Sequence, residues 1–281
     1  MRFGCHLSIK DGYLGAAKKA YGMQATAFQY FPKNPRSLSI KDFDKEDAAN
    51  CKAFGEEMGI LSVSHTPYPT SITPHDAEMR NQVVQSLLND MEIAEACGSI
   101  GVVVHFGKHL AKTTLLESYQ LMIEVLNEIL GQWEGQTKLL LENSAGMPGA
   151  IGTTFEELVQ IRKLCNEPEK IGFCLDTCHV FSCGLWNGDN WTEVADKATE
   201  LGFFENLEVV HFNNSKYPSG EGKDRHAPIF GTGHIKVNQF EQMLETPVIK
   251  QIPLILETPK EEIPHEKEIA LLIDRWGDLG V

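Results

Sequence analysis

The chain has 281 residues, of which 42% are hydrophobic and 23% charged, so it can form one large α/β domain or two small ones around a substantial core. Its apolar stretches are too short for a membrane span, and the N-terminus lacks the long apolar region of a secretory signal, so we expect a cytoplasmic protein. The net charge of −14 argues against non-specific tracking along nucleic acid, because phosphate contacts rest on Lys and Arg.

Eight short β-like runs alternate with amphipathic segments of helical length. The expected strands are residues 2–7, 25–31, 60–65, 100–106, 138–143, 171–176, 207–213 and 253–257. The expected helices are residues 12–23, 45–59, 77–98, 115–131, 154–165, 191–202, 237–246 and 266–277. Alternation of this kind predicts parallel strands with helical crossovers. Eight units favour a single-domain (β/α)8 TIM barrel over residues 1–281, with a doubly wound open sheet as the alternative.

Two Pro-, Gly- and Ser-rich stretches follow expected strands, at residues 66–74 and 213–234. In a barrel they become loops on the C-terminal face, where the active sites of this fold lie. The second stretch is too long for a mere connection, which favours a functional loop.

Six consecutive apolar runs end on or beside His, Asp or Glu, although a buried strand should end on an apolar residue. The resulting set of nine candidate metal ligands is His65, His105, Glu142, Asp176, His179, His211, Asp224, His226 and Glu257. Burying such groups costs several kcal/mol or more unless they are paired or bind metal. Any one of them alone would more often be a hydrogen-bonded core residue, but six runs in succession predict a metal site at the C-terminal face.

Zinc is bound by His nitrogen and carboxylate oxygen, and nine ligands can hold three ions if carboxylates bridge. Neighbouring ions of this kind can polarise a phosphoryl group, supply hydroxide and stabilise a leaving oxygen, as phosphodiester hydrolysis requires. Three Zn²⁺ against four ligand carboxylates leave this patch at about +2, which offsets the negative charge of the chain locally. A site built on Cys174, Cys178 and Cys183 is the weaker possibility, since they are not spaced as CxxC.

The motifs GCHLS, TAFQYFPKNPR, HTPY, HFGKH, LEN, CLDTCHVFSCG, HFNNSK, DRH and LETP occur in this order along essentially the whole chain. With them the chain resembles the endonuclease IV family, the metal-dependent apurinic/apyrimidinic (AP) endonucleases of base-excision repair. The resemblance implies a (β/α)8 barrel and three divalent metal ions, usually zinc. Because His and carboxylate sites also accept Mn²⁺ or Fe²⁺, the sequence leaves the metal open.

The resemblance also implies roles for individual residues. Glu142 would be catalytic, bridging two ions and orienting the attacking hydroxide. The ions would be held by His65 with His105, by Asp176 with His211 and Glu257, and by His179 with Asp224 and His226. Candidate substrate-binding residues are Arg36 and Tyr68, which would enter the DNA, together with His6, His109, Lys216 and Arg225 near the pocket or its phosphates.

The chain departs from the family pattern at four places. These are Asn214 after HxN, Pro69-Thr70-Ser71 after HTPY, Phe106 in HFG, and Thr232 within Gly231-Thr232-Gly233. None removes a ligand, but all are expected in or beside loops that touch substrate. They therefore leave the DNA specificity open, including the balance of abasic-site cleavage and 3′-end cleaning.

The function that this pattern predicts is hydrolysis of abasic or damaged double-stranded DNA 5′ to the abasic site, by a monomer that needs neither a membrane nor an obligate protein partner. One alternative is a sugar isomerase or epimerase of the xylose-isomerase-like barrels, which would use Glu142, Asp176, His211 and Glu257 around one ion. That reaction has no need of the other five ligands. A second alternative is a metal-holding nucleic-acid binder without turnover.

Overall fold

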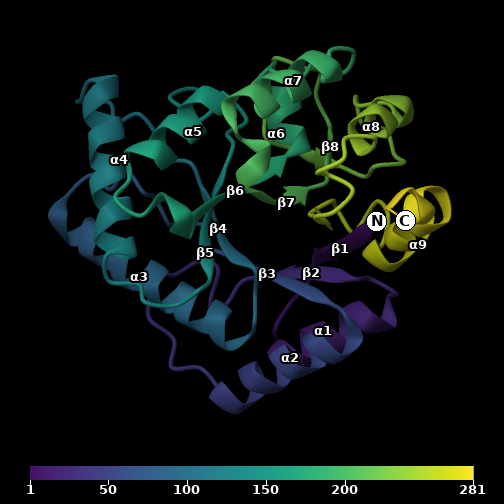
Figure 1. Cartoon of the computed structure of the whole chain (residues 1–281), viewed down its shortest axis with the longest axis horizontal. Coiled ribbons are helices and arrows are strands. Elements are labelled where there is room, and N and C mark those ends of the chain that lie inside the picture. Colours follow the sequence, from purple (N-terminus) through teal and green to yellow (C-terminus); the bar gives the residue numbers. More distant parts are fainter. Residues whose placement is uncertain (281) are drawn as a thin grey trace.

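A closed barrel of eight parallel strands lies at the centre of the structure, a computed structural model in which residues 1–280 are described (Figure 1). The barrel strands are β1 (Arg2–His6), β2 (Ala27–Tyr30), β3 (Leu61–His65), β4 (Gly101–His105), β5 (Lys138–Glu142), β6 (Ile171–Asp176), β7 (Leu207–His211) and β10 (Pro253–Leu256). Pairing of β1 with β10, in which Phe3 lies opposite Leu254, closes the sheet. The predicted barrel is confirmed, and the open-sheet alternative is wrong.

Helices surround the barrel and follow its strands in sequence (Figure 1). They are α1 (Tyr13–Gly22), α2 (Lys45–Met58), α3 (Ala77–Ala96), α4 (Leu115–Leu130), α5 (Phe155–Leu164), α7 (Trp191–Leu201), α8 (Val237–Leu244) and α9 (His265–Trp276). All eight were predicted, with ends that differ by one or two residues. None of the helices within residues 1–280 is both long and apolar enough to cross a bilayer.

Short elements escaped prediction because they span too few residues for a periodic pattern. They are α6 (Thr177–Ser182), the antiparallel pair β8 (Asn214–Ser215) and β9 (His226–Ala227), and the 3₁₀ turns η1 (Pro168–Lys170), η2 (Phe204–Asn206) and η3 (Gly277–Gly280). Two of them, α6 and β9, carry candidate ligands. The loop between β8 and β9 is part of the long stretch that the sequence predicted to be functional.

Local sequence explains where several helices begin. Thr114 and Thr154 start α4 and α5 with reciprocal capping boxes, in which Glu117 and Glu157 lie three residues further on. Asp44 and Asp76 cap α2 and α3 through their carboxylates. These caps satisfy backbone N–H groups that have no partner within the first turn of each helix.

The barrel interior holds one small apolar cluster formed by strand residues: Ala27, Val63, Val103, Leu140, Cys174, Val209 and Ile255. Side chains two positions apart along a strand point to the same face. The next inward-facing layer, toward the C-terminal end of the strands, therefore consists of residues two positions further on. That layer is polar throughout, and it contains the candidate site.

Candidate metal centre

The eight strands contribute one polar side chain each to the upper layer of the barrel. Adding two to the apolar positions gives Gln29, His65, His105, Glu142, Asp176, His211 and Glu257, and His6 takes the same place two residues after Gly4 in β1. Six of these residues were predicted as metal ligands from the ends of the strands. The alternation of the strands thus brings together ligands that lie as far apart in the chain as His65 and Glu257.

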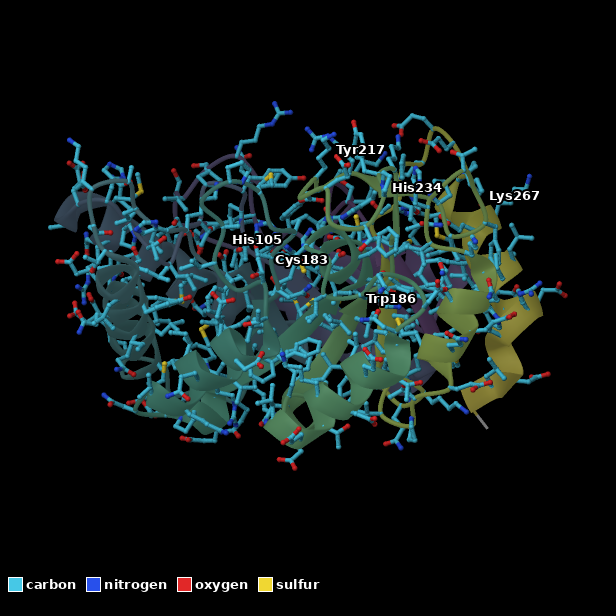
Figure 2. The ribbon with its side chains drawn as sticks, turned by 90° about the horizontal axis from the view of Figure 1, so that it is seen from above. His105, Cys183, Trp186, Tyr217, His234 and Lys267 are labelled. Carbon is cyan, nitrogen blue, oxygen red and sulfur yellow. The ribbon has the colours of Figure 1, made fainter. Side chains whose placement is uncertain are left out.

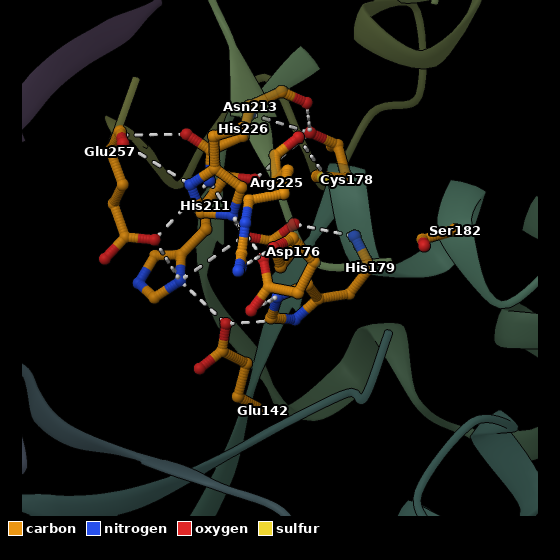
Figure 3. A network of polar contacts seen from close by, with 12 residues as sticks. Glu142, Asp176, Cys178, His179, Ser182, His211, Asn213, Arg225, His226 and Glu257 are labelled. Carbon is orange, nitrogen blue, oxygen red and sulfur yellow. Dashed lines mark hydrogen bonds and ion pairs between the residues drawn. The ribbon is translucent and has the colours of Figure 1, made fainter. Parts of the chain in front are cut away.

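Glu142 lies at the centre of this layer and is 1% exposed. Its Oε1 lies 3.0 Å from Nδ1 of His211 and 3.4 Å from Nδ1 of His179. Its Oε2 lies 3.3 Å from Nε2 of His105 and 3.6 Å from Nε2 of His65. The two oxygens thus face different pairs of imidazoles, as a carboxylate that bridges two ions would. Figure 3 shows Glu142 with His211 and His179.

A second, deeper group of donors lies on the Oε1 side of Glu142, away from His65 and His105. Nδ1 of His211 lies 3.2 Å from Oε2 of Glu257 and 3.8 Å from Oδ2 of Asp176. One donor atom from each of Glu142, Asp176, His211 and Glu257 falls within 4.8 Å of the others. This group is almost entirely shielded from solvent.

The third group comes from segments that follow the strands. His179 lies in α6, where its backbone N–H donates to Oδ1 of Asp176 at 2.8 Å. Asp224 lies in the loop that joins β8 to β9, and His226 begins β9. The Asp224 oxygens lie 3.3 Å from Nε2 of His179 and 3.3 Å from Nε2 of His226. The structure therefore brings all nine candidate ligands together in three neighbouring groups.

Several of these donor atoms are buried without a hydrogen-bond partner among residues 1–280. They include Oε2 of Glu142 and Nε2 of both His179 and His226. The two imidazole nitrogens lie within ion-pair distance of Asp224 but outside hydrogen-bond geometry. Unpartnered buried polar atoms cost about 1–3 kcal/mol each, so a ligand for them is expected. The His and carboxylate donors fit a divalent ion such as Zn²⁺.

The charges of the site influence each other strongly. Burial opposes ionisation of Glu142, but the imidazoles of His211 and His105 outweigh it and hold the pKa of Glu142 well below its ordinary value. Burial likewise opposes protonation of His226, yet Asp176 and the other nearby carboxylates raise the pKa of His226 to about 9. Glu142 is therefore ionised and ready to bind a cation, whereas His226 must first release a proton.

Two asparagines that the sequence did not single out hold the carboxylates in place. The amide of Asn143 accepts from the backbone N–H of Asp176 at 2.7 Å. Asn213 donates to Oδ2 of Asp176 at 2.8 Å and accepts from the backbone N–H of Glu257 at 2.8 Å (Figure 3). Asn143 follows β5 directly and Asn213 lies two residues after the end of β7, which was the available signal in LEN and HFN. Such partners orient ligands around a metal.

A cavity of about 310 Å³ opens over the metal ligands. Besides ligands, it is lined by His6, Phe31, Tyr68, Lys260 and His265. Of these, His6 and Tyr68 were predicted to bind substrate, and Tyr68 is 65% exposed. His265 belongs to none of the sequence motifs. It begins α9 and is buried, with Nε2 donating to the carbonyl oxygen of Thr258 at 2.9 Å.

Arg36 lies beside the site cavity rather than in it. It is exposed and lines a neighbouring hollow of about 650 Å³. The backbone N–H of Tyr68 donates to the carbonyl of Pro35 at 2.8 Å, which links the segments that carry the two predicted DNA-contacting residues. Lys33 anchors the same segment from below through a buried ion pair with Asp90 at 3.0 Å.

The other predicted substrate residues lie outside the walls of the cavity. His109 is exposed and directs Nε2 to the carbonyl of Thr113 at 2.8 Å. Lys216 pairs with Glu262 at 2.6 Å. Arg225 is exposed and donates to the carbonyl of Asp224 at 2.6 Å (Figure 3). If these three side chains bind substrate, they would contact parts of it that extend beyond the cavity.

Two of the departures from the family pattern, Phe106 and Asn214, have buried side chains. Phe106 is 5% exposed and packs under Gly152. Asn214 is 1% exposed, donates to the carbonyl of Ile235 and accepts from its backbone N–H, both at 2.9 Å. Asn214 thereby fastens the long loop after β7, whose Tyr217 and His234 lie near the upper edge of the molecule in Figure 2.

Thr232 and Pro69, by contrast, are exposed and lie in loops at the C-terminal end of the barrel. Trp186 and Trp191, which follow the sixth barrel strand, are buried, and their rings contact each other with centroids 5.3 Å apart. Figure 2 shows Trp186 deep among the side chains. These indoles therefore pack within the fold rather than stack on a substrate.

The fold agrees with comparisons to related chains. The family model described as "Xylose isomerase-like TIM barrel" matches residues 16–276. The curated protein "Probable endonuclease 4" of Symbiobacterium thermophilum is 40% identical over 273 residues, which cover 96% of this chain and 98% of that protein. The chain thus belongs to the xylose isomerase-like TIM barrel family and, within it, to the endonuclease IV proteins.

Solved structures give the same picture. The crystal structure of endonuclease IV from Thermus thermophilus superposes with a TM-score of 0.84 at 30% identity, covering 98% of each chain. A D-tagatose 3-epimerase-like protein superposes with a TM-score of 0.71 over the full length of both chains. At 18% identity, that second likeness shows a common fold and nothing more.

Proposed function

We propose that this chain is a metal-dependent AP endonuclease that hydrolyses the phosphodiester bond 5′ to an abasic site in double-stranded DNA. The observation that carries the proposal is the convergence of nine donors around Glu142 in a chain that resembles endonuclease IV along its whole length. A one-ion sugar isomerase would need only the deeper group, which leaves His65, His105, His179, Asp224 and His226 without a role.

The donors would hold three divalent ions, for which we propose Zn²⁺. His65, His105 and Glu142 form the exposed site, Glu142, Asp176, His211 and Glu257 the deeper one, and His179, Asp224 and His226 the third. When bound, such ions polarise the phosphoryl group, make water a competent nucleophile at neutral pH and neutralise the leaving oxygen. The exposed site lies at the mouth of the cavity, since the His105 side chain is 47% exposed.

The residues of the chain supply position and shape. Glu142, fixed between four imidazoles, sets the spacing of the ion sites and so the place of the scissile phosphate. Tyr68 stands at the cavity rim with its ring 5.1 Å from that of Phe31. An exposed aromatic there can fill the space left when a nucleotide turns out of the duplex. Arg36, on the adjoining segment, is placed to support the DNA where that nucleotide turns out of the duplex.

The proposed product carries a 3′-hydroxyl end, and the same cavity would admit a blocked 3′ terminus for cleaning. We propose that the protein acts on DNA in the cytoplasm. We also propose that the monomer suffices for activity, because all nine donors come from one chain. Because the chain as a whole carries a net charge of −14, its affinity for DNA phosphates is expected to come from the positive charge of the bound ions.

The test is a duplex oligonucleotide with one tetrahydrofuran abasic analogue, incubated with zinc-loaded protein, with a matched undamaged duplex as control. We expect cleavage at the 5′ side only and a product that a DNA polymerase extends directly. Intact abasic duplex at micromolar protein would reject the proposal. Plasma-emission analysis on the same sample should find about three ions per chain, whereas about one would favour the isomerase alternative.

A further inference from the structure

Gln29 is the one residue of the polar layer that neither belongs to the nine candidate ligands nor lines the cavity. It lies in β2, is fully buried, and comes two residues after Ala27 of the apolar interior. An amide at such a depth needs partners for both of its ends. Its partners are all groups of the site.

The orientation of the Gln29 amide follows from its contacts. Nε2 lies 2.8 Å from Oε1 of Glu257, and an ionised carboxylate can only accept a hydrogen bond. The amide nitrogen must therefore face Glu257, which places Oε1 of Gln29 toward Nε2 of His211 at 2.7 Å. The second N–H of the amide points to Nδ1 of His6 at 3.1 Å.

This orientation fixes the proton positions on two imidazoles. His211 must carry a proton on Nε2, because the amide oxygen of Gln29 can only accept. Its Nδ1 faces the deeper donor group and donates to Glu142 at 3.0 Å in the metal-free chain, so a bound ion would take the place of that proton. His6 must accept on Nδ1, so its remaining proton is on Nε2. No group within residues 1–280 forms a hydrogen bond with that nitrogen, and His6 lines the cavity.

We propose that Gln29 is a positioning residue that sets the tautomers of His211 and His6 together, so that His211 presents a lone pair to the deeper ion and His6 presents a neutral N–H donor to a phosphodiester oxygen of the substrate. The inference about the ligand of His6 rests on the proposed function. The inference about His211 and the deeper ion does not, because it concerns only the protein and its metal.

Two variants separate the two effects. Gln29→Met keeps the volume and removes every hydrogen bond of the amide. Gln29→Glu keeps an acceptor for His211 and, with a proton shared between its carboxyl group and Glu257, keeps that contact as well. It offers only an oxygen to His6, so Nδ1 of His6 would become the donor. The matched control is Gln239→Met in α8, a buried glutamine that donates to Asp189 at 2.9 Å and accepts from the backbone N–H of Lys236 at 2.8 Å, outside the site.

The first readout is metal affinity, measured by competition of the zinc-loaded protein with a chromophoric chelator. Gln29→Met should release its weakest ion about 10–100-fold more readily than wild type, as is usual when a partner of a metal ligand is lost. Gln239→Met should hold zinc as wild type does. Equal retention by Gln29→Met and the control would overturn the assignment for His211.

The second readout is the tautomer of His6, read from long-range ¹H–¹⁵N correlations of the imidazole. Wild type should show the proton on Nε2 and Gln29→Glu on Nδ1, and an unchanged tautomer would overturn the assignment for His6. With abasic duplex, Gln29→Glu should raise KM about tenfold or more, and this increase should vanish in a His6→Ala background. Additive effects of the two changes would contradict action through His6.

These arms fail separately from the proposed function. If wild type does not cleave abasic DNA at all, the proposed function is lost, while chelator competition and the histidine spectra still decide what Gln29 does. If wild type cleaves and the Gln29 variants behave as the control does, the positioning role alone is rejected.

Discussion

Replacing Glu142 with Gln should remove one ion rather than collapse the site. Each carboxylate oxygen faces its own pair of imidazoles, at 3.0–3.4 Å on one side and 3.3–3.6 Å on the other. An amide keeps one acceptor oxygen and puts an NH₂ group, which cannot bind a cation, in place of the other. The deeper group retains Asp176, His211 and Glu257, whereas the exposed group retains only two imidazoles. The exposed ion is therefore the one that Glu142→Gln should lose.

The size of the effect can be bounded from below. Loss of a partner that merely orients a metal ligand costs about 10–100-fold in affinity or activity. Loss of a ligand itself should exceed that, so we expect the exposed ion to bind more than about 100-fold weaker, which is about 2.8 kcal/mol. Turnover on abasic duplex should fall at least as far. Duplex affinity should fall less, since Arg36, Tyr68 and the positive charge of the two remaining ions are kept.

The assay combines metal analysis after gel filtration with single-turnover cleavage of abasic duplex. The matched control is Glu157→Gln, a carboxylate in the capping box of α5 that lies outside the metal centre. The control should keep three ions and wild-type turnover. A Glu142→Gln protein that keeps three ions and cleaves within tenfold of wild type would refute the bridging role.

Three further outcomes are expected. Arg36→Ala should weaken binding of abasic duplex by about 1–3 kcal/mol in fluorescence anisotropy at fixed salt, with little change in single-turnover rate, and unchanged affinity would retire its role. Lys33→Met leaves Asp90 buried without its partner, so it should lower the free energy of unfolding, measured in urea, by about 3–5 kcal/mol. The double variant Lys33→Met, Asp90→Leu should recover most of this loss. Equal losses in the single and double variants would contradict a pairing effect. In the metal-free chain the pKa of His226 is raised to about 9, so this histidine stabilises the fold fully below pH 6.5 and loses that contribution as the pH rises through 9. Zinc binding should therefore release protons at pH 7.5, because the ion displaces the proton of His226. The release is measured by calorimetry in buffers of different ionisation heat.

The fold could be predicted from sequence because its signal is repeated. Each strand is an apolar run bounded by loops, and each intervening segment has helical length and an apolar face, so errors at single boundaries leave the alternation intact. Closure could only be inferred from the number of units, since the pairing of β1 with β10 joins the two ends of the chain. The pair β8–β9 has two residues in each strand, too few for any periodicity.

The site was predictable where a polar residue ends an apolar run, as His65 and Glu142 do. Gln29 escaped that rule because Tyr30 and Phe31 continue the run beyond it. Its place follows instead from alternation, since it lies two residues after Ala27 just as Glu142 lies two after Leu140. The sequence placed Asn214 in or beside a functional loop but could not show which way its amide points. Only the fold reveals that it is turned inward, toward Ile235.

The same layer also explains why the barrel tolerates so many charged groups at its centre. Glu142, Asp176 and Glu257 lie among imidazoles and amides, yet Oε2 of Glu142 still has no hydrogen-bond partner within residues 1–280. Packing alone would favour apolar residues at these positions, as it does one layer below. A set of donors this costly to bury, kept in register by eight strands, is better explained by the ions it can bind than by any contribution to folding.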